Sequence, residues 1–164
     1  MIVWLDHHLW ILPFLIFSAI EAGLAAVFFI KSKGFLLAGV DSENRKEIYS
    51  SLTGSSSGLL GFSLAAVAIL AAFGRRAGVT PESRARENRL ANARVGISKV
   101  LLSTSVLLMT LLVAATVGIG IDGAKVGNFP LTSIVVSAAI SSLVGLLVSG
   151  AGLTLSLMER SREN

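Results

Sequence analysis

The strongest constraint on the fold of this chain is an uncharged apolar segment, 131–157, that is 27 residues long. A helix needs about 20 apolar residues to cross the hydrocarbon core of a bilayer. Small residues recur at every fourth position of the segment, which places them on one slowly winding ridge of a helix. This ridge consists of Ser133, Ser137, Ser141, Gly145 and Ser149. In lipid, a small-residue ridge lets another helix approach closely, so the segment predicts a membrane-spanning helix whose groove packs against a helix of the same subunit or of another one.

The composition agrees with a membrane protein rather than a soluble domain. Hydrophobic residues make up 53% of the chain and charged residues 15%, whereas a typical soluble domain has about 25% charged residues. The longest polar stretch is too short for a separate soluble domain, so we expect a single polytopic membrane domain over residues 1–164. The absence of cysteine excludes disulfides and thiolate metal sites. The net charge of +4 does not indicate nucleic-acid binding, because the cations flank apolar segments.

Three further apolar segments give the expected fold class, an all-α integral membrane protein with four transmembrane helices. These helices are expected at about 10–30, 54–73, 100–121 and 131–157. Thr80, Pro81 and Glu82 are typical of an N-cap and first helical turn, so a short basic helix over about 81–98 is expected to lead into the third span. Asp41 can cap another short helix before the second span.

The second span has two alternative interpretations. Gly54, Gly58 and Gly61 begin a line of small residues with steps of four and three, which predicts a helix-packing seam. The Ser/Gly run at its start is also compatible with unwound backbone that lines a cavity. A segment that enters and leaves the membrane on the same side is the related alternative.

The distribution of charge predicts the orientation. With four spans, nine Lys and Arg residues lie on the side of both termini and five on the opposite side. This excess predicts cytoplasmic termini, in a bacterial inner membrane or a plasma membrane. With a re-entrant second segment the counts become thirteen and one. The first ten residues contain no Lys or Arg, so we do not expect a cleavable signal peptide.

Candidate functional residues lie within the spans and in one loop. Glu21 is the only charged residue within a predicted span, and a carboxylate there must face protein or water or be protonated. It is interpreted either as an ion site or as a neutral group bonded to a neighbouring helix. Uncharged pathway candidates are the hydroxyls of Ser103, Thr110, Ser137 and Ser141. A basic loop is a candidate site for anionic lipid or a protein partner, or a simple topology determinant; its arginines are Arg75, Arg76, Arg84, Arg86, Arg89 and Arg94.

These features favour a homo-oligomeric channel or pore, which in one variant is a membrane-disrupting effector. The alternatives are a non-conducting scaffold that docks a partner through its basic loop, and a small transporter. Beyond the bilayer and further copies of the chain, we expect no cofactor, metal or nucleic acid. An enzyme is not expected, because the two histidines are adjacent and interfacial and no span contains paired carboxylates.

Overall fold

The computed structural model describes residues 9–31, 36–72, 80–123 and 126–161, and the described residues form helices without any strand. A 3-10 turn, η1 (Leu9–Ile11), precedes α2 (Leu12–Lys31), and a second, η2 (Leu36–Gly39), precedes α3 (Ser42–Ala72). The chain then forms α4 (Pro81–Ile121) and α5 (Phe129–Ser161). Four segments are long and apolar enough to cross a membrane: Leu9–Ile30, Ser42–Ala72, Glu87–Ile121 and Phe129–Thr154.

The helices begin where the local sequence favours a first turn. The N–H of Arg45 donates to the carbonyl of Asp41 at 2.9 Å, so α3 begins directly after this acidic residue. The N–H of Arg84 donates to the carbonyl of Thr80 at 3.0 Å. Prolines occupy early positions of α2, α4 and α5, where the missing N–H has no helical partner to lose.

The second predicted span needs correction. No short separate helix precedes it, because α3 runs without a break from Ser42 to Ala72. Residues 54–58 are helical, so the unwound-backbone alternative is wrong. A single straight helix of 31 residues also contradicts a segment that turns back within the membrane. Ser and Gly lower helix propensity only modestly, and packing against a neighbouring helix outweighs that cost.

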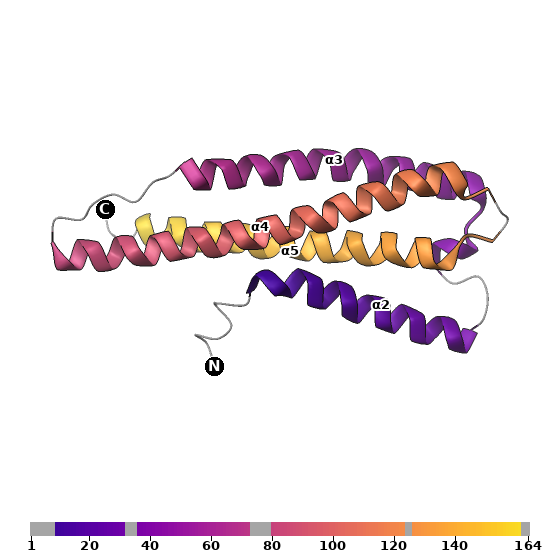
Figure 1. Ribbon diagram of the computed structural model, residues 1–164, viewed down its shortest axis with the longest axis horizontal. Coiled ribbons are helices and arrows are strands. Elements are labelled where there is room, and N and C mark those ends of the chain that lie inside the picture. The colour runs from indigo at the N-terminus through magenta and orange to yellow at the C-terminus, as the bar shows by residue number, and fades with distance from the viewer. Residues whose placement is uncertain (1–8, 32–35, 73–79, 124–125, 162–164) are drawn as a thin grey trace.

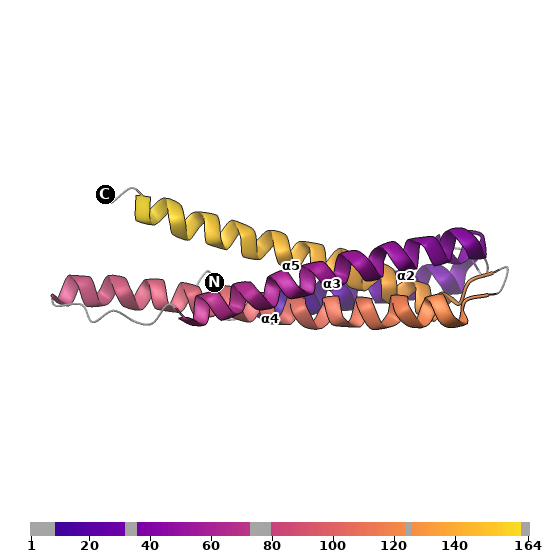
Figure 2. The same cartoon turned by 90° about the horizontal axis from the view of Figure 1, so that it is seen from above.

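The expected continuity between the basic helix and the third span is confirmed. They form one helix, α4, of 41 residues, which is about 61 Å long at 1.5 Å per residue. This length is about twice the thickness of a hydrocarbon core. Figures 1 and 2 show the basic start of α4 extending beyond the ends of α3 and α5. The last helix also continues beyond its predicted end at residue 157, to Ser161.

α4 is the central helix, because α3 and α5 both pack mainly on it (Figure 1). α3 is antiparallel to α4, and the hydroxyls of Ser63 and Ser105 lie 2.7 Å apart across this contact. α5 is also antiparallel to α4, with Gly145 against Thr104 and Gly152 against Ile97. Figure 2 shows that α5 moves away from α4 toward its C-terminal end.

α2 packs mainly on α5 and completes the bundle on that side. The ring of Phe28 stacks on Phe129, with the ring centroids 4.1 Å apart, so the end of α2 lies beside the start of α5. The tightest apolar core lies near this end of the bundle and joins α3, α4 and α5. Its buried members are Tyr49, Leu111, Ala115, Val135 and Ala138.

Candidate functional site

The most completely built polar site is a buried ion pair between α3 and the residue that follows α4. Arg45 lies one turn into α3, and Asp122 directly follows the last residue of α4. The Arg45 Nε donates to Oδ2 of Asp122 at 2.8 Å, and Nη2 donates to Oδ1 at 3.0 Å. Both side chains are shielded from solvent, with 0% and 1% of their surface exposed. This two-pronged geometry is the strong form of an arginine–carboxylate interaction.

The surroundings of this pair supply further partners. The hydroxyl of Tyr49 donates to Asp122 Oδ2 at 3.2 Å, and Arg45 Nη1 donates to the carbonyl of Val40. The N–H of Gly127 donates to the carbonyl of Ala38 at 3.0 Å. We call Arg45, Tyr49 and Asp122 the Arg45 cluster. Because it joins α3, the end of α4 and the segment before α3, it fastens one end of the bundle.

Two glycines make room for the cluster. A Cβ on Gly127 would lie 2.9 Å from Arg45 Nε and 3.0 Å from the Cα of Ala38. A Cβ on Gly118 would lie 2.7 Å from Cε2 of Tyr49. Real Cβ atoms do not approach other atoms this closely, so glycine is required for the close fit on both sides of the cluster.

The cluster was not anticipated from the sequence. Arg45 and Tyr49 follow Asp41 in the polar segment before the second predicted span, and Asp122 lies in the glycine-rich turn after the third. One signal was available in the sequence. Arg45 precedes the second span and Asp122 follows the third, and two antiparallel neighbouring spans place these two segments at the same end of the helices.

The Ser133–Ser149 ridge lies inside the contact between α5 and α4. Ser137 and Ser141 are fully buried, and Gly145 is also buried because a Cβ there would meet the side chain of Thr104. Ser149 is buried with its hydroxyl donating to the carbonyl of Gly145 at 2.8 Å. The ridge therefore makes its helix contact within the chain.

Two ridge hydroxyls differ from the other serines of the helices. The Oγ atoms of Ser137 and Ser141 are buried and have no hydrogen-bond partner. The hydroxyl of Ser133, by contrast, donates to the carbonyl of Pro130 at 3.0 Å. An unpartnered buried hydroxyl costs free energy, so these two are the ridge positions where a polar ligand or water would be most favourable.

The remaining candidates for a pathway lie on different elements. Glu21 lies on α2 and is half-buried, and its Oε1 is buried without a partner. Ser103 is buried, and its hydroxyl donates to the carbonyl of Val100 at 2.8 Å. Thr110 is half-buried and donates to the carbonyl of Val106 at 3.0 Å. The two α4 hydroxyls are thus paired with their own helix, whereas the Glu21 oxygen is not.

The glycine seam of α3 faces away from the bundle. Gly54, Gly58 and Gly61 are exposed, and a Cβ at any of them would meet nothing within 4 Å. Ser56 and Ser63 face inward instead and are 1% and 0% exposed. The seam therefore packs against no described part of its own chain.

The basic loop is only partly described. Arg75 and Arg76 lie outside the described residues, and Arg86 is described only as a position in α4. Arg84 and Arg89 are exposed on α4. Arg94 contacts Glu87, with 3.4 Å between Nη1 and Oε1. The described part of the loop is therefore a charged helical surface.

Among the described residues, no group of three or more His, Asp or Glu side chains is arranged to hold a metal ion. Comparison of the chain with protein-family models, curated proteins and solved structures gave no match.

Proposed function

We propose that this chain is a multi-pass membrane protein whose copies assemble along the outer face of α3 into a pore, with both termini cytoplasmic. The observation that carries this proposal is the difference between the two small-residue surfaces of the bundle. The ridge of α5 is covered by α4, whereas the seam of α3 is uncovered.

The exposed surface of α3 combines small residues with the large apolar side chains of Phe62, Leu64 and Ile69. Its exposed residues include small polar and small apolar side chains at helical spacing, namely Ser50, Gly54, Ser57, Gly58 and Gly61. Of the residues in the most apolar stretch of α3, 11% are buried, and 6% in the first span, against 50% in α4, so the small residues rather than the low burial distinguish α3. Small residues favour close helix contact in a membrane, because they let backbones approach and gain dispersion energy.

Exposed hydroxyls on α3 support a pore between subunits. Ser50, Ser51, Ser55 and Ser57 expose hydroxyls on α3. Such hydroxyls offer hydrogen bonds to water and ions without the cost of a buried charge. If the glycines contact a neighbouring subunit and the serine hydroxyls face water, α3 would both join the subunits and line the ion path between them.

Glu21 supplies a second element of the proposal. Its carboxyl is half-buried on α2, and one oxygen has no partner. A carboxylate within a span favours cations over anions. We therefore assign Glu21 a long-range electrostatic effect on ion selectivity, because α2 lies on the opposite side of α4 and α5 from α3 (Figure 1).

A flux measurement in liposomes tests this function. The purified protein should release a trapped cation faster than protein-free vesicles do. Gly58→Leu should abolish release by blocking the α3 contact, whereas Gly23→Leu makes the same change at an exposed glycine of α2 and should leave release intact. Glu21→Gln should lower the cation-to-anion preference. Absence of flux with every ion tested would contradict the pore.

One observation favours a second function, a membrane anchor that docks a protein partner. The basic start of α4 extends beyond the bundle and exposes Arg84 and Arg89. Such a cationic helix complements an acidic protein surface. Under this alternative, liposomes show no flux with any ion.

A further inference from the structure

We propose that the groove between the start of α2 and α4 binds an anionic phospholipid of the surrounding bilayer, with Lys99 contacting the phosphate. This inference rests on the membrane location in the proposed function, but it requires neither the pore nor the α3 interface. It assigns a ligand to a surface that the proposed pore does not use.

The groove has a volume of roughly 480 Å³ and lies beside the turn η1. It is lined by Trp10, Phe14, Lys99, Leu102, Ser103 and Val106. η1 packs against α4, so the groove joins the first span to the third. The walls are almost entirely apolar, and Lys99 is the one charged residue among those that line them.

The walls of the groove suit an acyl chain. Phe14, Leu102 and Val106 contribute apolar surface, and Leu102 and Val106 are exposed. The hydroxyl of Ser103 donates to its own helix, so its hydrogen bond is already made. From Lys99 to Val106 the helix rises by about 10 Å, which is about a third of the hydrocarbon core.

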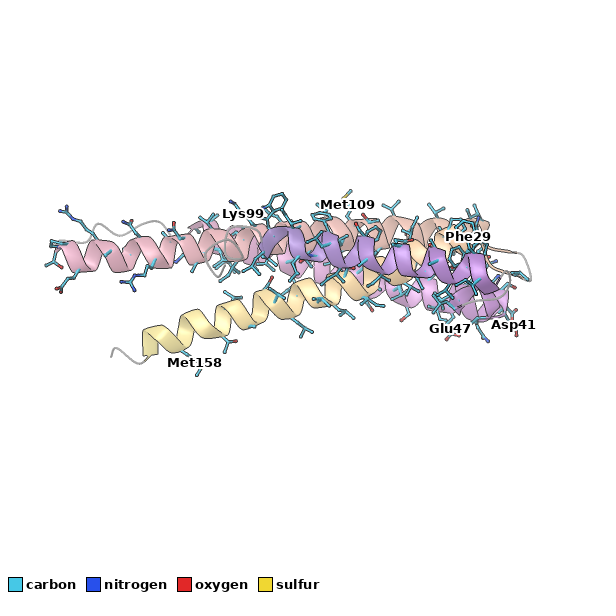
Figure 3. The ribbon with its side chains drawn as sticks, turned by 90° about the horizontal axis from the view of Figure 1, so that it is seen from below. Phe29, Asp41, Glu47, Lys99, Met109 and Met158 are labelled. Atoms are coloured by element: carbon cyan, nitrogen blue, oxygen red, sulfur yellow. The ribbon has the colours of Figure 1, made fainter. Side chains whose placement is uncertain are left out.

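Lys99 lines the groove and supplies the positive charge that a phosphate headgroup requires. It is exposed and has no ion pair with any carboxylate among the described residues. It is the last charged residue before the apolar part of α4 begins. Figure 3 shows Lys99 away from the end of the bundle that holds Asp41 and Glu47.

Trp10 lines the same groove from η1, on the wall opposite α4. It is 41% exposed and belongs to η1, directly before α2. Tryptophan favours the boundary between headgroups and hydrocarbon, where its ring is apolar and its N–H is wet. A tryptophan and a lysine at this boundary, above apolar walls, complement a phosphate with an acyl chain beneath it.

The composition of the chain permits a direct test, because Trp4 and Trp10 are its two tryptophans. In the Trp4→Phe variant, Trp10 is the only tryptophan and reports contact with brominated acyl chains by fluorescence quenching. The full chain is reconstituted in phosphatidylcholine vesicles that contain a small fraction of brominated phosphatidylglycerol. A matched sample contains brominated phosphatidylcholine at the same fraction.

We expect brominated phosphatidylglycerol to quench Trp10 at a mole fraction about fivefold lower than brominated phosphatidylcholine does, the factor expected for one lysine near an anionic lipid. Lys99→Gln should remove this preference, whereas Lys46→Gln, the same change at an exposed lysine of α3, should retain it. Equal quenching by both lipids would overturn the lipid site. Absence of quenching by either lipid would overturn the membrane location itself.

Discussion

Arg45 and Asp122 lie 77 positions apart in the chain, yet their side chains form a buried ion pair with 2.8 Å between Nε and Oδ2. The pair joins the first turns of α3 to the end of α4. These two helices pack against each other and run antiparallel. Tyr49 adds a hydrogen bond to the same carboxylate at 3.2 Å. The register between α3 and α4 is therefore defined by a charged contact at one end of the bundle.

Removal of one partner of this pair should destabilise the fold strongly. Asp122→Ala is expected to lower the free energy of unfolding by about 3–5 kcal/mol, because Arg45 then remains buried without its counter-charge. Glu87→Ala breaks the more exposed pair with Arg94 and should cost at most about 1 kcal/mol. Denaturant unfolding in detergent micelles, followed by circular dichroism, measures both values.

A double variant separates the effect of the unpaired charge on stability from the effect of lost packing. Arg45→Met combined with Asp122→Leu should recover most of the stability lost in Asp122→Ala, because no unpaired charge remains. If Asp122→Ala costs no more than Glu87→Ala, the cluster does not fasten the bundle.

A methyl group at Gly118 should disturb the same region. The added Cβ would lie 2.7 Å from the ring of Tyr49, which its hydroxyl bond and the surrounding core hold in place. Gly118→Ala is therefore expected to lower stability by about 1–3 kcal/mol. Gly120→Ala is the matched control on the same helix, since nothing lies within 4 Å of its Cβ position; this variant should be neutral or more stable by up to about 1 kcal/mol. Thermal unfolding of both proteins decides the point, and equal transition temperatures would contradict the observed packing.

Substitution of Gly145 should act on the single subunit rather than on assembly. The sequence ridge left open whether this glycine packs within or between subunits, and the structure places it against Thr104 of the same chain. Gly145→Leu is expected to separate α5 from α4 and to abolish the folded, protease-resistant bundle. Gly150→Leu, one and a half turns further along α5, has open space and should resist proteolysis like the unaltered protein. Comparable resistance of both variants would contradict the α4–α5 contact.

Much of the fold follows from hydrophobic length alone. Uncharged segments of about 20 residues specify helices, and their existence and order agree with the structure. The start of α3 was predicted twelve residues too late, because the charged turns after Asp41 lack the apolar signal and indicated a separate short helix rather than part of the span. They are helical because Arg45 and Tyr49 gain buried partners there, and no local pattern encodes those partners.

The orientation of small-residue surfaces could not be predicted in the same way. The seams of α3 and α5 have nearly the same spacing, yet Gly145 is buried and Gly58 is exposed. Which seam a neighbour covers depends on the rotation of each helix about its axis. For α3 that rotation agrees with the Ser63–Ser105 contact and the Arg45 cluster, both of which involve residues far apart in the chain.

The orientation in the membrane is tested by single cysteines, because the natural chain has none. Glu43→Cys reports the end of the bundle that holds the Arg45 cluster, and Ala85→Cys reports the basic start of α4; both positions are exposed. The excess of Lys and Arg predicts that an impermeant thiol reagent added outside intact cells labels residue 43 but not residue 85. The opposite pattern would show that the termini face outward.

The most direct measurement of the central claim is a disulfide cross-linking scan of α3 in native membranes, with one cysteine at a time from residue 54 to residue 65. Assembly along α3 predicts covalent dimers at the exposed positions Ser57, Gly58, Gly61 and Ala65, with the period of a helix, and none at Ser56 or Ser63, which face α4. Absence of dimers at every position, or dimers without helical periodicity, would contradict assembly along α3.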